Sequence, residues 1–444
     1  MAVRLPLDPF ERLMVADSRR GYPMCFFVEM SGSGRLDRAR FTVAVRSAAA
    51  RHPRLRSRRA GLIRPVWRAP DREPTVESAD VGTPWRPIDL RRESAARFVI
   101  VADGSDSQGR WRVVLMMHHA ACDGLAACEI WGDVWTLYHG GRLPPLRDGG
   151  TRSRPHAAPT SPTPASPGWW QSLRDFAALL PQPLLPPPRQ RQPATGGCEP
   201  YATLVIDEDR ANRLRTAALA LGGTFNDVVV AASLRAAAAW NERHGGGGSR
   251  RPLRVNMPVS LRPLGARLPA VNAIGYAFFD RTPAECREIR PLVASVAVAS
   301  RWVQDTGAAG EFVRTVGWLA AVPGLLGLVC RIPGCLATLV ASNIGDVGRR
   351  MRADIPYVDR LGMPDGLRIE RAAGVPPIRP GTAVALGIVT YGWTTTISAL
   401  ADTARLGSGA AAVFLGLVDE ELDRIAAAAA AAGEPVAAVT STEE

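Results

Sequence analysis

Apolar residues recur along the chain in two patterns. In one they repeat every three or four positions, as on one face of a helix, and in the other they form short continuous runs as long as a strand. Residues 224–243 carry apolar side chains three and four positions apart, which predicts a helix with one buried face. Residues 36–52 follow the same pattern, and Pro53 predicts where that helix stops. Residues 112–117 form a short apolar run, which is typical of a buried strand.

The same reasoning predicts strands and helices along both halves of the chain. Strands are predicted over residues 25–30, 95–102, 202–206, 253–259, 273–280 and 339–344. Helices are predicted over residues 124–138, 291–302 and 418–432. A closing set of antiparallel strands is predicted over residues 367–373, 383–391 and 393–400. Because both halves mix strands with helices, the pattern favours two α/β domains.

The length of 444 residues also favours two domains, since one core rarely grows to that size. Residues 146–199 contain repeated Pro-rich runs without sustained periodicity, which is linker composition. A short helix is predicted over residues 169–180 within this linker. We therefore expect a first domain over residues 1–145 and a second over 200–444.

Charge changes this picture little. The net charge is +12, and every one of the 54 basic residues is Arg, which excludes a Lys nucleophile or Schiff base. The Arg residues are spread along the chain, whereas nucleic-acid binding favours basic clusters with interleaved aromatic residues. The densest run, residues 51–59, is interpreted as a solvated surface. Attraction of a phosphate-bearing donor is the weaker alternative.

The seven Cys residues form no C-x-x-C pair and no grouping with zinc spacing, so we expect reduced thiols, no metal and a cytoplasmic location. The first residues contain no apolar core of signal-peptide length. Residues 316–330 are strongly apolar but shorter than a membrane span. A buried or surface-lying helix is favoured there, and peripheral contact with a membrane or an acyl chain stays open.

The string His118-His119-Ala120-Ala121-Cys122-Asp123-Gly124 lies between the strand predicted over 112–117 and the helix predicted over 124–138. Imidazole can accept and return a proton near neutral pH. Asp123 can fix the turn by pairing with a distant Arg, and Gly124 allows the backbone to bend or approach closely. The alternative is a buried His pair with Asp123 as a helix N-cap.

This string resembles the active-site motif of the condensation-type acyltransferase superfamily, which has the chloramphenicol acetyltransferase-like fold. The resemblance implies an α/β (α+β) chain of two such domains, each a mixed sheet packed with helices, with an active-site channel between them. It implies His119 as the catalytic base, with His118 packing or orienting and Asp123 mainly structural. No bound cofactor is implied; acyl-CoA or a phosphopantetheine thioester is the expected co-substrate.

Other stretches resemble the same superfamily. Residues 51–53 resemble the end of its first long helix, and residues 226–229 the start of a helix in its second domain, where we expect only helix capping. Residues 254–262 resemble the strand carrying a structural Arg, which implies an Asp123–Arg262 pair. Ser342 and Asn343 belong to a Ser-Asn-x-Gly stretch that resembles the channel wall and can hold the acceptor or a developing oxyanion. Ordinary turn chemistry is the alternative.

Together these features predict an acyltransferase that moves an acyl group from a thioester, on coenzyme A or an acyl carrier protein, to an alcohol or amine. Two alternatives remain at this stage. One is a stand-alone condensation enzyme that forms an amide on carrier-bound substrates. The other is a non-catalytic, condensation-like protein that binds partners.

Overall fold

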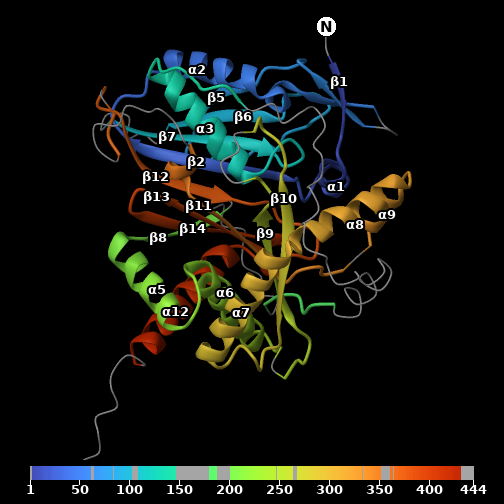
Figure 1. The fold of residues 1–444 in the computed structure, drawn as a ribbon, viewed down its shortest axis with the longest axis vertical. Helices are drawn as coiled ribbons and strands as arrows, with labels where there is room; N and C mark the ends of the chain where they lie inside the picture. Colours follow the sequence, from blue (N-terminus) through green and yellow to red (C-terminus); the bar gives the residue numbers. More distant parts are fainter. Residues whose placement is uncertain are drawn as a thin grey trace, which may run out of the picture.

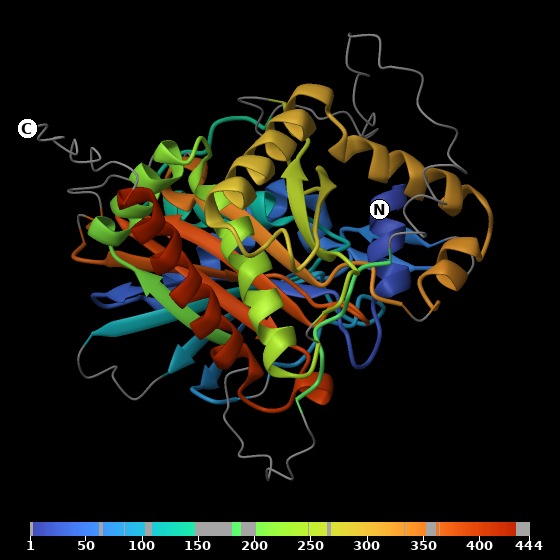
Figure 2. The ribbon, with the colours of Figure 1, turned by 90° about the horizontal axis from the view of Figure 1, so that it is seen from below.

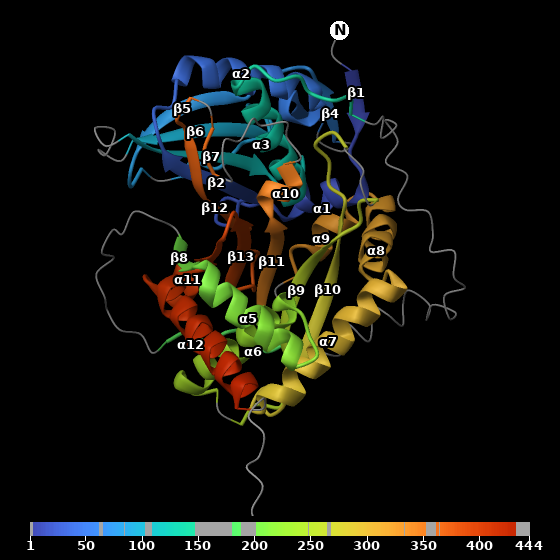
Figure 3. The ribbon, with the colours of Figure 1, turned by 60° about the vertical axis from the view of Figure 1, so that its left-hand side comes forward.

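The computed structural model describes residues 3–61, 65–83, 85–102, 109–146, 180–187, 201–246, 248–263, 268–332, 334–351, 361–363 and 365–431. Two large sheets lie one above the other, and helices cover their outer sides (Figures 1 and 3). Each sheet mixes parallel and antiparallel pairs, so the predicted class of two mixed sheets packed with helices is confirmed.

The first sheet has the strand order β12-β2-β7-β6-β5. Apolar residues of α2 and α3 pack against one side of it, and the core there is rich in aromatic rings. The bounds are β2 (Cys25–Ser33), α2 (Arg38–Arg51), β5 (Thr75–Asp80), β6 (Ala96–Ala102), β7 (Arg110–His118), α3 (Gly124–Tyr138) and β12 (Arg368–Val375).

The second sheet has the order β10-β9-β11-β13-β14-β8, and a separate buried cluster joins it to its helices. Its strands are β8 (Tyr201–Ile206), β9 (Leu253–Ser260), β10 (Ile274–Arg281), β11 (Leu339–Asp346), β13 (Val384–Tyr391) and β14 (Thr394–Ala401). Its covering helices are α5 (Glu208–Ala220), α6 (Phe225–Arg243), α7 (Ile289–Thr306) and α12 (Ala410–Ala430).

Smaller elements lie around these two layers. A three-stranded sheet, β1-β4-β3, lies beside the first sheet, and α8 and α9 project at one side of the molecule (Figures 1 and 2). The bounds are β1 (Val3–Pro6), α1 (Pro9–Asp17), η1 (Pro53–Arg56), β3 (Arg58–Ala60), β4 (Val66–Ala69), α8 (Ala309–Ala321), α9 (Leu325–Val329), α10 (Val347–Met351) and α11 (Thr403–Leu406).

Local signals predicted several elements closely. The predicted helix over 124–138 is α3, and the helix predicted to stop at Pro53 ends at Arg51. The side chain of Thr224 accepts from the Asp227 amide, and Asp227 reaches back to the Thr224 amide, so a capping box begins α6. The final helix begins at Ala410 rather than 418, after Gly409 in a left-handed conformation (φ +78°).

The expected closing set of three antiparallel strands is wrong in one respect. β13 and β14 pair with each other, but β12 leaves them and pairs with β2 in the first sheet. Gly374 of β12 and Gly387 of β13 explain why the two sheets can approach here. A Cβ added to Gly387 would lie 1.9 Å from the carbonyl oxygen of Gly374.

Part of the predicted linker is described. Residues 180–187 are extended, Leu184 is buried in the core of the second sheet, and the Gln182 amide donates to Pro252. The helix predicted over 169–180 lies outside the described residues except for Leu180. Among the described helices, no single one is long and apolar enough to cross a membrane, whereas α5 and α6 meet that test together as a pair bent by 91°.

Candidate active site

His118 ends β7 and is buried. Its Nδ1 accepts a hydrogen bond from the Ala120 amide at 3.2 Å, and its Nε2 lies 3.2 Å from Ser18 Oγ. An accepting Nδ1 leaves the proton on Nε2, which describes a neutral ring. Burial lowers the pKa of His118 to about 3, and the neighbouring His119 adds to this effect. His118 therefore holds the turn and carries no charge.

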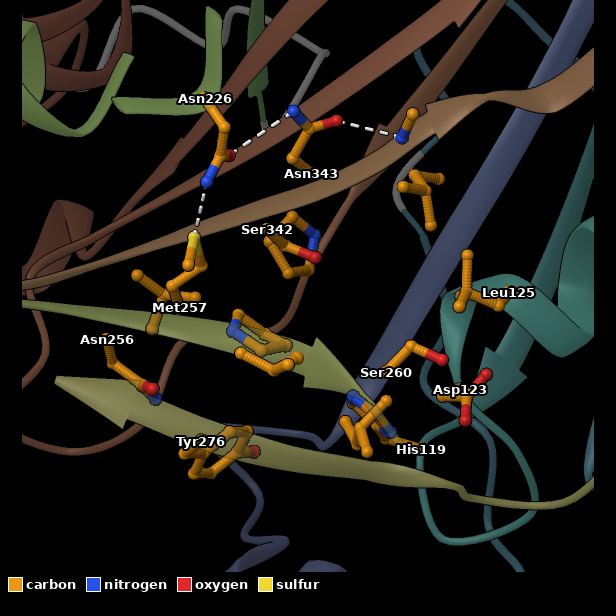
Figure 4. Close-up of a pocket in the computed structure, with 18 of the residues that line it drawn as sticks. His119, Asp123, Leu125, Asn226, Asn256, Met257, Ser260, Tyr276, Ser342 and Asn343 are labelled. Atoms are coloured by element: carbon orange, nitrogen blue, oxygen red, sulfur yellow. Dashed lines mark hydrogen bonds between the residues drawn. The ribbon is translucent and has the colours of Figure 1, made fainter. Parts of the chain in front are cut away.

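His119 lies on the other side of the backbone and lines a cavity of about 320 Å³ (Figure 4). Its ring lies against Phe26 and Phe10, with centroids 5.1 and 6.2 Å away. Nδ1 is enclosed without a hydrogen-bond partner, which leaves Nε2 as the nitrogen open to the cavity. Burial lowers the pKa of His119, and this outweighs the opposing effects of backbone carbonyls and the Asp123 carboxylate. The ring is therefore uncharged near neutral pH.

Asp123 makes both of the interactions that its sequence position allowed. Its Oδ1 accepts from the Ala126 amide at 3.0 Å and caps α3. Its Oδ2 accepts from Arg262 Nη1 at 2.6 Å and from the Ala273 amide at 2.7 Å. The structure thus brings Asp123 and Arg262 together, and both side chains are buried. This pair joins the motif to the chain that follows β9.

The connection between β9 and β10 also holds the backbone of the motif. Asn272 Nδ2 donates to the carbonyl oxygens of His119 at 2.8 Å and Ala120 at 3.1 Å. His52, from the stretch recognised at the end of α2, accepts from the Ala270 amide at 3.0 Å. Sequence reasoning did not identify Asn272, because an Asn in a loop has no distinguishing neighbour in the chain. The backbone of the motif is therefore held by the connection between β9 and β10.

The second domain forms the facing wall of the cavity through β11. Ser342 and Asn343 both line it, as expected from the sequence (Figure 4). Asn343 Oδ1 accepts from the Gly345 amide at 2.8 Å, and its Nδ2 lies 3.3 Å from Asn226 Oδ1. The Asn343 amide is therefore occupied within the wall. The Ser342 hydroxyl makes no hydrogen bond to a described residue.

Asn226 corrects one expectation. We expected residues 226–229 to serve only in helix capping, but Thr224 and Asp227 form the cap without Asn226. The Asn226 side chain instead lines the cavity and lies 2.9 Å from Met257 Sδ (Figure 4). An Asn as the second residue of a capped helix is the only signal in the sequence, and it does not distinguish a cavity residue.

Several further polar residues of the cavity were not predicted, among them Asn256 and Tyr276. Asn256 is 5% exposed, and its Oδ1 has no hydrogen-bond partner among the described residues. Burial raises the pKa of Tyr276 to about 12, so its phenol remains protonated. Gly124 serves close approach, since an added Cβ would lie 3.0 Å from Ile344. The cavity therefore combines one uncharged base with a wall of mixed polar and apolar residues, which includes the cations Arg350 and Arg379.

Comparison with known proteins agrees with this architecture. No protein-family model matches the chain. Two proteins of Mycobacterium tuberculosis, Uncharacterized protein Rv2305 (strain ATCC 25618 / H37Rv) and Uncharacterized protein MT2362 (strain CDC 1551 / Oshkosh), are each 26% identical over 326 residues, which cover 67% of this chain and 72% of the relative.

Solved structures match over nearly the whole chain. Polyketide synthase associated protein 5 from Mycobacterium tuberculosis has a TM-score of 0.62 at 17% identity, covering 96% of this chain and 100% of that one. The first condensation domain of the CDA synthetase has a TM-score of 0.63 at 16% identity, covering 96% of each chain. The condensation domain of Monacolin K polyketide synthase MokA has a TM-score of 0.60 at 12% identity, covering 96% and 98%.

The chain therefore has the two-domain fold of condensation domains and polyketide synthase associated protein 5. The resemblance drawn from the His-His-x-x-x-Asp-Gly string is confirmed at the level of the fold.

Proposed function

We propose that this protein is an acyltransferase that moves an acyl group from a thioester to an alcohol or amine, with His119 as general base. The observation that carries the proposal is the uncharged His119 ring, which lines a cavity between the two domains with Nε2 open to it. A base of this kind is suited to take a proton from an attacking hydroxyl or amino group.

The proposed reaction needs one proton to move twice. Nε2 of His119 takes the proton of the acceptor while the acceptor oxygen or nitrogen attacks the thioester carbonyl carbon. The carbon–sulfur bond then breaks, and the leaving thiolate takes the proton from the imidazolium. The Ser342 hydroxyl of β11 is the proposed donor to the oxyanion, since it lines the cavity and makes no hydrogen bond to a described residue.

The donor is proposed to be a thioester on coenzyme A or on the phosphopantetheine arm of a carrier protein. Similar structures include condensation domains of the CDA synthetase and of Monacolin K polyketide synthase MokA, and the nonribosomal peptide synthetase FmoA3, which supports a thioester donor. The alternative, formation of an amide on carrier-bound substrates, differs from ester formation in its acceptor. The experiment described next distinguishes the two by their products.

The test is mass spectrometry of products formed from acyl-CoA thioesters and acylated carrier protein, each offered with a panel of alcohols and amines. Wild-type protein is expected to form an ester or amide, and His119→Ala is expected to lower the rate at least about 100-fold. His244→Ala is the matched control, because that ring lies at the end of α6 against Trp240 and does not line the cavity. Equal rates for wild type and His119→Ala would overturn the proposal.

A further inference from the structure

Two short helices project from the side of the molecule and present large apolar side chains to solvent. α8 and α9 are separated by a break at Val322-Pro323-Gly324 and lie at one edge in both Figures 1 and 2. The α8–α9 patch is defined by five exposed residues with exposed fractions of 39–64%: Trp318, Val322, Leu328, Ile332 and Leu336. These five exposed apolar residues fall within 19 positions of the chain, and such a concentration marks an interaction surface more often than a solvated one.

The charges within the segment that carries the patch have one sign, and the one acidic residue of α8, Glu311, is paired with Arg314. Residues 315–345 contain no Asp or Glu. Arg19 donates to the carbonyl oxygen of Cys330 at the end of α9, with exposed Arg20 next to it, and exposed Arg331 follows directly. None of these three Arg residues forms an ion pair with a described residue. An apolar surface bordered by such cations complements the headgroups of anionic lipids.

α8 reaches the cavity indirectly, through one aromatic residue that lines it. Phe312 of α8 packs on Tyr276, with ring centroids 4.7 Å apart, and Tyr276 lines the cavity. Phe10 of α1 contacts both Tyr276 and the His119 ring. α1 is fixed to α8 by Arg12, which donates to the carbonyl oxygen of Ala320 at 3.2 Å. Aromatic contacts therefore run without interruption from the inner side of the patch to the cavity.

We propose that the α8–α9 patch docks on the surface of an anionic phospholipid bilayer, with Trp318 and Leu328 entering the interface and Arg19, Arg20 and Arg331 facing the headgroups. A bilayer fits better than a second protein surface, because Trp at an apolar–polar boundary and flanking Arg are the features that lipid interfaces select. The docking itself does not depend on the proposed acyl transfer. It would place the cavity next to the membrane.

The experiment measures sedimentation of the full chain with vesicles of phosphatidylcholine that contain about 30% phosphatidylglycerol, and with vesicles of phosphatidylcholine alone. We expect stronger binding to the anionic vesicles, weakened by added salt because the attraction is partly electrostatic. The double variant Trp318→Gln/Leu328→Gln is expected to lower the partition coefficient at least about tenfold, and Arg331→Glu to weaken binding only to anionic vesicles.

The matched control is Leu219→Gln/Val413→Gln, which changes two apolar residues, 76% and 55% exposed, on α5 and α12. This control should bind as wild type does, and so should His119→Ala, which separates docking from the proposed catalysis. Absence of vesicle binding, or equal binding by both double variants, would overturn the proposal. Light scattering can also overturn the proposal. If wild-type protein is a dimer and only Trp318→Gln/Leu328→Gln is a monomer, the patch binds a second copy of this chain.

Discussion

Two adjacent imidazoles differ because neighbouring side chains at the end of a strand point to opposite sides. His118 turns into the first domain, where both ring nitrogens find partners, whereas the His119 ring lies at the cavity and its Nδ1 makes no hydrogen bond to a described residue. The sequence predicted that this pair and Asp123 would lie together. It could not predict which polar groups would surround the rings, since Ser18 and Asn272 are distant in the chain.

His118 is expected to make stability depend on pH. Its folded pKa of about 3 lies below its ordinary value of 6.5, so the unfolded chain binds the proton more readily between these values. The contribution of neutral His118 to the free energy of unfolding is fully present above pH 6.5. It is lost as the pH falls towards 3, by about 5 kcal/mol in total. Denaturant unfolding between pH 3 and 6.5 should show that the free energy of unfolding depends less on pH in His118→Asn than in wild type. The Asn Oδ1 can still accept a hydrogen bond from the Ala120 amide. An unchanged slope would contradict this account.

The Asp123–Arg262 pair is expected to be costly to break. Arg262→Ala leaves a buried carboxylate with only backbone partners, so the free energy of unfolding should fall by about 3–5 kcal/mol. Arg110→Ala is the comparison, because Arg110 is 60% exposed in a 3.6 Å pair with Glu370 and should cost at most about 1 kcal/mol. Similar losses for the two variants in denaturant unfolding would show that Arg262 acts as a surface residue.

At the scale of elements, the sequence predicted those whose signals are local. The apolar stripe and N-cap of α6 and the strand–turn–helix around the motif all depend on residues within a few positions of each other. The small sheet of β1, β3 and β4 was not predicted, because its strands are only three or four residues long. In the connection from β9 to β10 the resemblance implied Arg262, but Asn272 was missed, since its role depends on residues far away in the chain.

That connection leads to a prediction about Asn272. Asn272→Ala removes two hydrogen bonds to the carbonyl oxygens of His119 and Ala120, so the catalytic ring should lose its fixed position. If acyl transfer occurs as proposed, kcat should fall roughly 10- to 100-fold while KM changes little. Steady-state kinetics with the best donor and acceptor would measure this. A change confined to KM would instead assign Asn272 to substrate binding.

At the scale of the whole molecule, two sheets meet at a pair of glycines. Gly387→Ala would place a methyl group 1.9 Å from the Gly374 carbonyl oxygen, and both groups belong to strands that cannot easily shift. We expect a loss of about 3 kcal/mol in the free energy of unfolding. Gly416→Ala is the control, because it has open space around it on α12 and should stabilise by up to about 1 kcal/mol. Equal stability of the two variants in denaturant unfolding would argue against close contact of the sheets.

The position of β12 determines when the first sheet can be completed as the chain is synthesised. During synthesis, β2 is made early, yet its partner strand Arg368–Val375 emerges only after most of the second domain. Until then one edge of β2 has unpaired backbone groups, which makes it prone to pair with another chain. A fragment that stops after α3 would carry that open edge permanently, so the two halves must mature as one folding unit.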